Sequence, residues 1–84
     1  MPKILPIKLK LVKKIKKHGL WKKFQKQIKF LEKEPAYSSL HVELLEPKQY
    51  GIYSFRIDRK YRALFFYRPD KEEVEIINIT VHYH

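Results

Sequence analysis

The spacing of apolar residues along the chain changes at Pro35. Before it, apolar residues recur mainly at intervals of three and four, as on the buried face of an amphipathic helix; they are Leu20, Trp21, Phe24, Ile28 and Leu31. Gly19 interrupts the preceding segment, and a proline cannot continue a helix without the loss of a hydrogen bond. The pattern therefore predicts a helix over about 20–34.

The first eighteen residues carry two overlapping patterns. Ile7, Leu11 and Ile15 have the spacing of a helix, whereas Leu9 makes the stretch from Ile7 to Leu11 alternate as a strand does. We interpret this segment as a short strand near 3–8 followed by a helix near 9–18.

After Pro35 the period becomes two, and β-branched and aromatic residues become frequent, which is typical of strands. The predicted strands are 41–45, 52–57, 61–68 and 74–83. The segments that join them are short and turn-like, so we expect antiparallel hairpins. The predicted fold class is α+β, with two helices packed on one face of a twisted, mainly antiparallel sheet.

The turn between the strands 52–57 and 61–68 decides which side chains face each other. If residues 58–60 form a three-residue turn, Arg56 lies opposite Arg62. One face of the sheet then carries Tyr53, Phe55, Ile57, Tyr61, Ala63 and Phe65, and the two arginines lie on the other face. Like charges side by side destabilise a pair of strands, but they suit a bound phosphate. Alternatively, each arginine pairs with a nearby acid; the candidates are Asp58, Glu43 and Glu75.

Length and composition exclude several classes of protein. The 84 residues predict a single domain, residues 1–84, and the absence of cysteine excludes disulfides, a thiol nucleophile and cysteine-built zinc sites. The longest apolar run, residues 63–67, is far too short to span a membrane. The N-terminal segment lacks the continuous apolar stretch of a secretory signal. These features indicate a soluble protein of the cytoplasm.

The charge is unevenly distributed. Residues 1–33 carry +11, with twelve lysines and one acid, while residues 34–84 carry −1, which together give the net charge of +10. Such a surface attracts nucleic acid, an anionic membrane or an acidic partner chain, although a solvated helix face could have the same composition. For RNA binding we select four lysines of this segment: Lys13, Lys16, Lys22 and Lys26.

Three stretches of the sequence resemble one protein family. Residues 51–66, GIYSFRIDRKYRALFF, are followed by IINITVHY at 76–83, and PAYSSL at 35–40 precedes both. In order and spacing these segments resemble the RelE/ParE superfamily of toxins from toxin–antitoxin systems. They are most similar to the YoeB-type branch, which has a Gly-aromatic strand, a downstream arginine and a C-terminal His-Tyr.

The resemblance implies a β-α-α-β-β-β-β fold and a specific activity. Members of this branch are mRNA interferases, that is, ribosome-dependent endoribonucleases that cut mRNA without a metal or other cofactor. The 2′-hydroxyl of the RNA attacks the adjacent phosphate. The implied partners are a cognate antitoxin protein, the ribosome and mRNA, with neither a membrane nor a small-molecule cofactor.

The resemblance also assigns roles to residues of this chain. Arg62 matches the arginine that stabilises the charge of the transition state, and its planar fork suits a phosphate. His82 matches the general acid, whose ordinary pKa allows it to give up a proton near neutral pH. Tyr83 matches a tyrosine that stacks on a base or positions the RNA backbone. Arg56 matches a basic position that holds a flanking phosphate.

The general base has two candidates. An ungapped count back from Gly51 places the glutamate of the YoeB-type branch at Glu43, whereas a loop insertion leaves His41 as the candidate. The lysines that the family has near this strand have no counterpart between residues 40 and 46. Lys48 or a lysine of the helices could take their place.

Two other functions fit the same sequence. A ParE-like toxin that inhibits gyrase has the same fold and no ribonuclease chemistry, and a non-catalytic relic could bind RNA without cutting it. His82 and His84 have a spacing that could bind a metal, but no third ligand is indicated, so we expect no metal site. Neither Arg62 nor His82 occupies an evident core position, so replacing either is expected to leave the fold intact.

Overall fold

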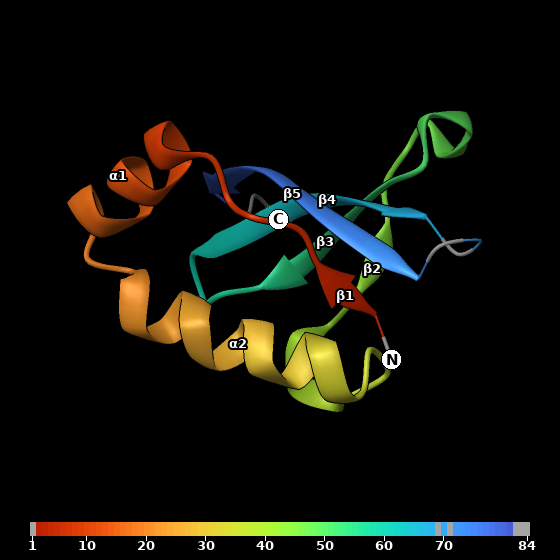
Figure 1. Cartoon of the computed structure of the whole chain (residues 1–84), viewed down its shortest axis with the longest axis horizontal. Helices are drawn as coiled ribbons and strands as arrows, with labels where there is room; N and C mark the ends of the chain where they lie inside the picture. Colours follow the sequence, from red (N-terminus) through yellow and green to blue (C-terminus); the bar gives the residue numbers. More distant parts are fainter. Residues whose placement is uncertain (1, 69, 71, 82–84) are drawn as a thin grey trace.

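Apart from the short first strand, the α-helices precede the strands along the chain. The computed structural model describes residues 2–68, 70 and 72–81. Along the chain these residues form β1 (Lys3–Ile4), α1 (Leu9–Lys17), α2 (Trp21–Lys33), the 3₁₀ helix η1 (Ser38–Leu40), β2 (Glu43–Leu44), the 3₁₀ helix η2 (Lys48–Tyr50), β3 (Ile52–Arg56), β4 (Tyr61–Arg68) and β5 (Glu73–Val81), as Figure 1 shows. The predicted α+β class is confirmed.

The strands form one mixed sheet in the order β1-β5-β4-β3-β2. β1 is parallel to β5, and the other three neighbouring pairs are antiparallel, so the prediction of a mainly antiparallel sheet is also confirmed. β4 lies at the centre with β3 and β5 beside it, which places its residues among the best-protected of the sheet.

Both helices cover the same face of the sheet. The buried side chains of α1 and α2 join the alternate, core-facing residues of the strands in one apolar cluster, which includes Leu11, Ile15, Phe24, Leu31, Phe55, Ala63, Phe65 and Ile79. The Phe24 ring of α2 lies 6.0 Å from the Phe55 ring of β3, measured between centroids. The opposite face of β3 and β4, which we call the outer face, carries the alternate residues Ser54, Arg56, Arg62 and Leu64.

The long elements match their predicted ranges closely, but the two edge strands are shorter than predicted. β1 covers Lys3–Ile4 rather than 3–8, because Pro6 has no N–H group to donate to the ladder. β2 covers Glu43–Leu44 rather than 41–45, because His41 has a φ of 46° in the turn that closes η1. The last strand was predicted over 74–83, and its final two residues lie outside the described part of the chain.

No helix within the described residues is both long enough and apolar enough to cross a membrane.

Candidate functional site

The register of the β3–β4 hairpin brings the two arginines together, as the sequence predicted. Arg56 lies directly opposite Arg62, and the Ile57 N–H donates to the Tyr61 carbonyl oxygen at 3.0 Å. The turn is held by Asp58, whose Oδ1 accepts the backbone N–H groups of Lys60 and Tyr61 at 2.9 and 2.8 Å. The short polar side chain of aspartate suits this role, because it can mimic a backbone acceptor.

Glu43 belongs to the same outer face as the arginines. It lies opposite Ser54 in the β2–β3 pair, and Ser54 is two residues before Arg56 on β3, so both point to one side of the sheet. The negative charge of Glu43 acts on Arg62 and raises its pKa, although stronger effects oppose it. The outer face therefore unites one carboxylate with two guanidinium groups.

Arg62 is buried, which corrects the expectation that it could be replaced freely. Arg62 is only 6% exposed, because β4 is the central strand of the sheet and the β3–β4 turn lies beside it. Its Nη1 donates to the backbone oxygen of Asp58 at 3.3 Å. Burial lowers the pKa of Arg62, and the charge of Arg56 lowers it further, while Glu43 and Asp58 raise it. An arginine stays charged under such conditions, so this site holds a fixed, partly desolvated positive charge.

Arg56 is left without a partner for part of its guanidinium group. Its Nε is buried and has no hydrogen-bond acceptor among the described residues. Buried polar atoms are nearly always hydrogen-bonded, so this Nε is an exception within the described part of the chain. The alternative, in which Arg56 and Arg62 each form an ion pair with a nearby acid, is not observed among the described residues. Glu75, one of the candidate acids, pairs instead with Arg68 at 2.9 Å.

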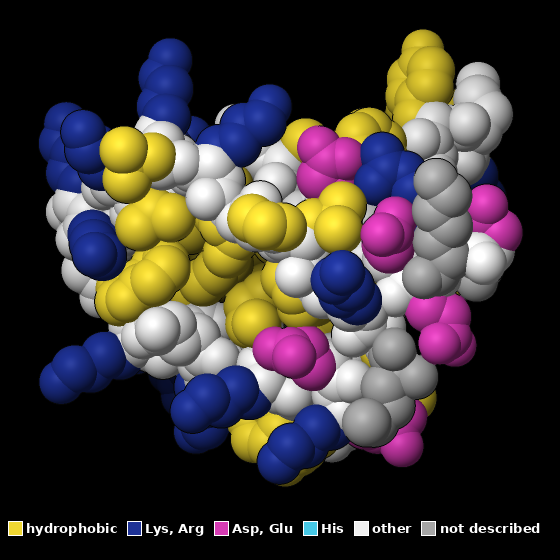
Figure 2. All heavy atoms as spheres, viewed as in Figure 1, with side chains coloured by type: hydrophobic (Ala, Val, Ile, Leu, Met, Phe, Trp, Pro, Cys, Tyr) yellow, Lys and Arg dark blue, Asp and Glu magenta, His cyan; other side chains and the backbone are white. Residues whose placement is uncertain are grey.

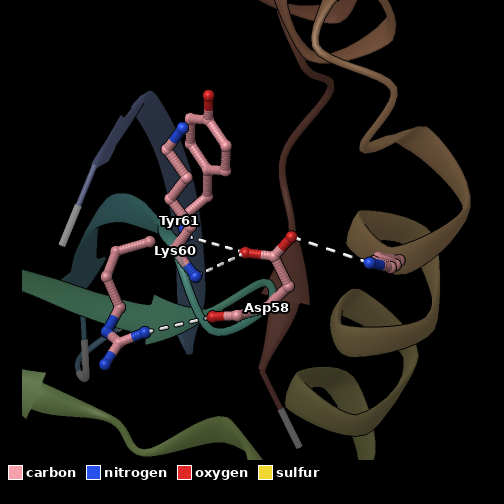
Figure 3. Close-up of polar contacts among 5 residues, drawn as sticks. Asp58, Lys60 and Tyr61 are labelled. Atoms are coloured by element: carbon pink, nitrogen blue, oxygen red, sulfur yellow. Dashed lines mark hydrogen bonds and ion pairs between the residues drawn. The ribbon is translucent and has the colours of Figure 1, made fainter.

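Asp58 connects the hairpin turn to the helix layer. Figure 3 shows its carboxylate between the turn backbone and α2, where Oδ2 lies 3.7 Å from the Lys23 Nζ. Burial alone would raise the pKa of Asp58, but hydrogen bonds from Tyr61 and Lys60 and the charge of Lys23 together lower it. One residue thus fixes the turn, contacts α2 through its side chain and holds Arg62 through its backbone.

The remaining predicted residues of this region are His41, Lys48, His82 and Tyr83. His41 is exposed at the end of η1, two residues before Glu43. Lys48 lies in η2, which precedes the start of β3, whereas Arg56 ends that strand roughly 13 Å away along its axis. His82 and Tyr83 lie outside the described residues. The described part of β5 ends with Thr80 opposite Arg62 and Val81 opposite Tyr61.

The predicted RNA-binding lysines lie on the helix layer, on the other side of the sheet from the arginine pair. Lys13 and Lys16 belong to α1, and Lys22 and Lys26 belong to α2. Figure 2 shows blue side chains gathered around the two helices, whereas most acidic side chains in this view lie toward the opposite end. The Lys16 Nζ lies 5.2 Å from the centre of the Trp21 ring, so this lysine also packs against its own layer.

The described residues contain no group of three or more histidine, aspartate or glutamate side chains that could hold a metal ion.

Sequence reasoning missed the role of Gln27. This residue of α2 is 7% exposed, and its Nε2 donates to the backbone oxygens of Arg56 at 2.7 Å and Ser39 at 3.2 Å. A signal was present, because Gln27 stands three residues after Phe24 and four before Leu31, within the apolar stripe of α2. A polar residue at such a position needs buried partners.

A scan against protein-family models and a search of the curated proteins find no match to this chain. What the site does is therefore inferred from its geometry and from the sequence motifs.

Proposed function

We propose that this protein is the toxin of a type II toxin–antitoxin system, a ribosome-dependent endoribonuclease with a RelE/ParE-type, YoeB-like fold. The observation that carries the proposal is the Arg56–Arg62 pair on the outer face, with Glu43 on the neighbouring strand. Two adjacent guanidinium groups on one face of the sheet suit a phosphate group, because each can donate charge-assisted hydrogen bonds to its oxygens. The sequence resemblance supplies the class of phosphate, namely the backbone of mRNA.

Arg62 is proposed to stabilise the transition state. When the 2′-oxygen attacks the adjacent phosphorus, negative charge accumulates on the phosphoryl oxygens. The Arg62 side chain is anchored at Asp58 before the RNA arrives, so little reorganisation is needed as this charge develops. Arg56 would hold a neighbouring phosphate and keep the RNA backbone in register.

Two proton transfers complete the proposed reaction. A base takes the proton of the 2′-hydroxyl, the 2′-oxygen–phosphorus bond forms, and the bond to the 5′-oxygen breaks as that oxygen receives a proton from an acid. Glu43 is the base that shares the outer face with Arg62, with His41 as the alternative. His82 is the proposed acid, and Tyr83 would position the RNA. The products are a 2′,3′-cyclic phosphate and a 5′-hydroxyl, and the reaction needs no metal.

The helix layer is proposed to provide affinity for the ribosome. Four of its lysines, Lys13, Lys16, Lys22 and Lys26, can neutralise phosphates of ribosomal RNA, which gives strong and salt-dependent binding without sequence selection. A cognate antitoxin would silence the protein by covering the outer face.

The test adds purified protein to translating ribosomes and maps mRNA cuts by primer extension, with the 3′ ends analysed for cyclic phosphate. Glu43→Gln and His82→Ala are each expected to lower the cutting rate about 10²–10⁴-fold, as is typical for loss of a general base or acid. Glu46→Gln is the matched control, because Glu46 is exposed and lies outside the outer-face cluster. Its rate should equal that of the wild type.

Three results would contradict the proposal or part of it. Wild-type protein that leaves mRNA intact but abolishes DNA supercoiling by gyrase would indicate a gyrase-inhibiting toxin. Protein that binds RNA and does neither would indicate a non-catalytic relic. Normal cutting by Glu43→Gln would remove Glu43 as the base and transfer that role to His41.

A further inference from the structure

A cationic groove begins where the outer face ends. β2 pairs with β3 only as far as Ser54, so within the described part of the chain no strand lies beside Arg56 on that side. In its place, a groove of about 470 Å³ runs between α2, residues 37–39 and the β3–β4 turn. Arg56 lines this groove and also belongs to the outer face, so the two meet at this residue on the edge of the sheet.

The groove is positively charged, and two of its cationic side chains are available to bind a ligand. Lys23 is paired with Asp58, whose carboxylate also accepts two backbone N–H groups. Lys26 and Arg59 line the same groove, are exposed, and form no ion pair within the described residues. The unpaired cations Lys26 and Arg59 give the groove a net positive charge, which favours an anionic ligand.

One wall of the groove is an aromatic surface that is already in place. The rings of Phe30 and Tyr37 are stacked, with centroids 4.3 Å apart and an angle of 22° between their planes. Phe30 is half-buried and supports Tyr37, which is 37% exposed. A ring held in this way can stack on a nucleobase without first being ordered, and stacking is tolerant of base identity.

We propose that this groove binds single-stranded RNA next to the phosphate held by Arg56 and Arg62. Tyr37 stacks on a base, and Lys26 and Arg59 contact the phosphates on either side of it. The combination of a cationic track and an aromatic platform is the one that single-stranded nucleic acids require. This inference rests on the proposed ribonuclease function, because the groove is taken to hold the substrate strand of that site.

Binding is tested with full-length protein and a fluorescein-labelled 2′-O-methyl oligouridylate of twelve nucleotides, by fluorescence anisotropy at several salt concentrations. This probe cannot be cleaved through its 2′ position, so the measurement is independent of catalysis. Tyr37→Leu keeps an apolar contact with Phe30 but removes the ring, and Tyr37→Phe keeps the ring. Tyr50→Leu is the matched control, because Tyr50 is 64% exposed and lies in η2 at the other end of β3.

Tyr37→Leu is expected to weaken binding about fivefold to a hundredfold, the usual effect of losing one stacked base, while Tyr37→Phe and Tyr50→Leu stay within about twofold. The double variant Lys26→Gln/Arg59→Gln should lower the log–log salt slope by about 1.4, since a single strand loses about 0.7 per phosphate contact. Lys29→Gln/Lys33→Gln removes the same charge from other exposed positions of α2 and should leave the slope unchanged.

Equal losses in both double variants would indicate diffuse attraction and would overturn the proposal. So would unchanged binding in Tyr37→Leu, or a twelve-residue glutamate peptide that binds as tightly and loses affinity in the same variants. Failure of the ribonuclease function is distinguishable. If the wild-type protein cuts no mRNA but the groove variants lose RNA affinity, the groove proposal stands and the ribonuclease proposal fails. If the wild-type protein cuts mRNA normally and the groove variants bind RNA as the wild type does, only the groove proposal fails.

Discussion

The helix layer and the outer face of the sheet both carry positive charge, but they hold it in different ways. The lysines of α1 and α2 are exposed, and their flexible side chains carry compact charges into solvent. On the outer face, Arg62 is buried against the turn, and the Arg56 Nε is buried without an acceptor among the described residues. The first arrangement suits attraction at a distance, and the second suits the recognition of one group at a fixed position.

In the proposed function, this difference assigns affinity for RNA to the helix layer and catalysis to the outer face. Exposed lysines gain from releasing counterions along a phosphate backbone, and no single one of them is essential. A buried arginine has already lost part of its hydration, so its interaction with a phosphate is stronger and more directional. We therefore expect single changes on the outer face to affect cutting far more than single changes on the helix layer.

Among changes that compare the two kinds of positive charge, the largest effect is expected from Arg62→Lys. The change keeps one positive charge but removes the fork that reaches both the Asp58 carbonyl and a phosphate, so the cutting rate should fall about 10²–10³-fold. Arg68→Lys is the control, because Arg68 lies on the same strand and pairs with Glu75 at its far end. Primer extension on translating ribosomes measures both rates, and equal rates would remove Arg62 from the proposed mechanism. Because Arg62 is buried, thermal unfolding of each variant is measured alongside.

The next effect concerns the helix layer. Reversing the charge at Lys13, Lys16, Lys22 and Lys26 should weaken ribosome binding about tenfold to a hundredfold and lower the log–log salt slope by about 3. Lysine-to-arginine changes at the same four positions keep the charge and should keep the slope. Sedimentation with ribosomes at several salt concentrations provides the measurement. An unchanged slope in the reversed variant would show that these lysines face solvent only.

The contrast between the two regions also shows what the sequence could and could not predict. The periods of α2, β3 and β4 predicted the elements and their faces, and the three-residue turn at 58–60 predicted the arginine pair. These features depend on local spacing. The shortness of β1 and β2 depends on Pro6 and on the left-handed turn at His41, which limit pairing that the alternation alone would allow.

Features that depend on contacts between distant segments were missed. The burial of Arg62 follows from the central position of β4, and the Phe30–Tyr37 stack joins α2 to the segment after Pro35. Neither is encoded by spacing along the chain. Gln27 lies between these two kinds of feature. Its position in an apolar stripe of the sequence indicates that a polar group is buried there, but it does not indicate which backbone oxygens that group binds.

Gln27 connects the two regions, so replacing it should loosen both. Gln27→Leu leaves the Arg56 carbonyl without its donor and should lower the free energy of unfolding by about 1–3 kcal/mol. For a domain of this size each kcal/mol corresponds to roughly 4–8 °C in Tm. Gln25→Leu, at an exposed position of the same helix, should stay within about 0.5 kcal/mol. Thermal melts followed by circular dichroism compare the two, and equal melting temperatures would show that the Gln27 contacts contribute nothing.

The smallest effect concerns the second link between the regions, the Asp58 carboxylate. Its pKa is lowered in the folded protein, so the unfolded state binds its proton at a higher pH than the folded state does. The resulting stabilisation is present above the unfolded pKa of about 4 and is lost as the pH falls through the lower, folded value. Lys23 is largely exposed, so the ion pair itself adds little, and most of the effect comes from the two turn hydrogen bonds.

Asp58→Asn keeps an acceptor for the turn but cannot gain or lose this proton. The variant should therefore lose less than about 1 kcal/mol at pH 7, and its unfolding free energy should fall less steeply than that of the wild type below pH 4. Asp70→Asn, at an exposed position beyond β4, should follow the wild-type curve. Urea unfolding between pH 2 and pH 7 measures all three proteins. If the Asp58→Asn and wild-type curves ran parallel through the acid range, the carboxylate would not be coupled to the fold. The turn that positions Arg62 would then depend on its backbone alone.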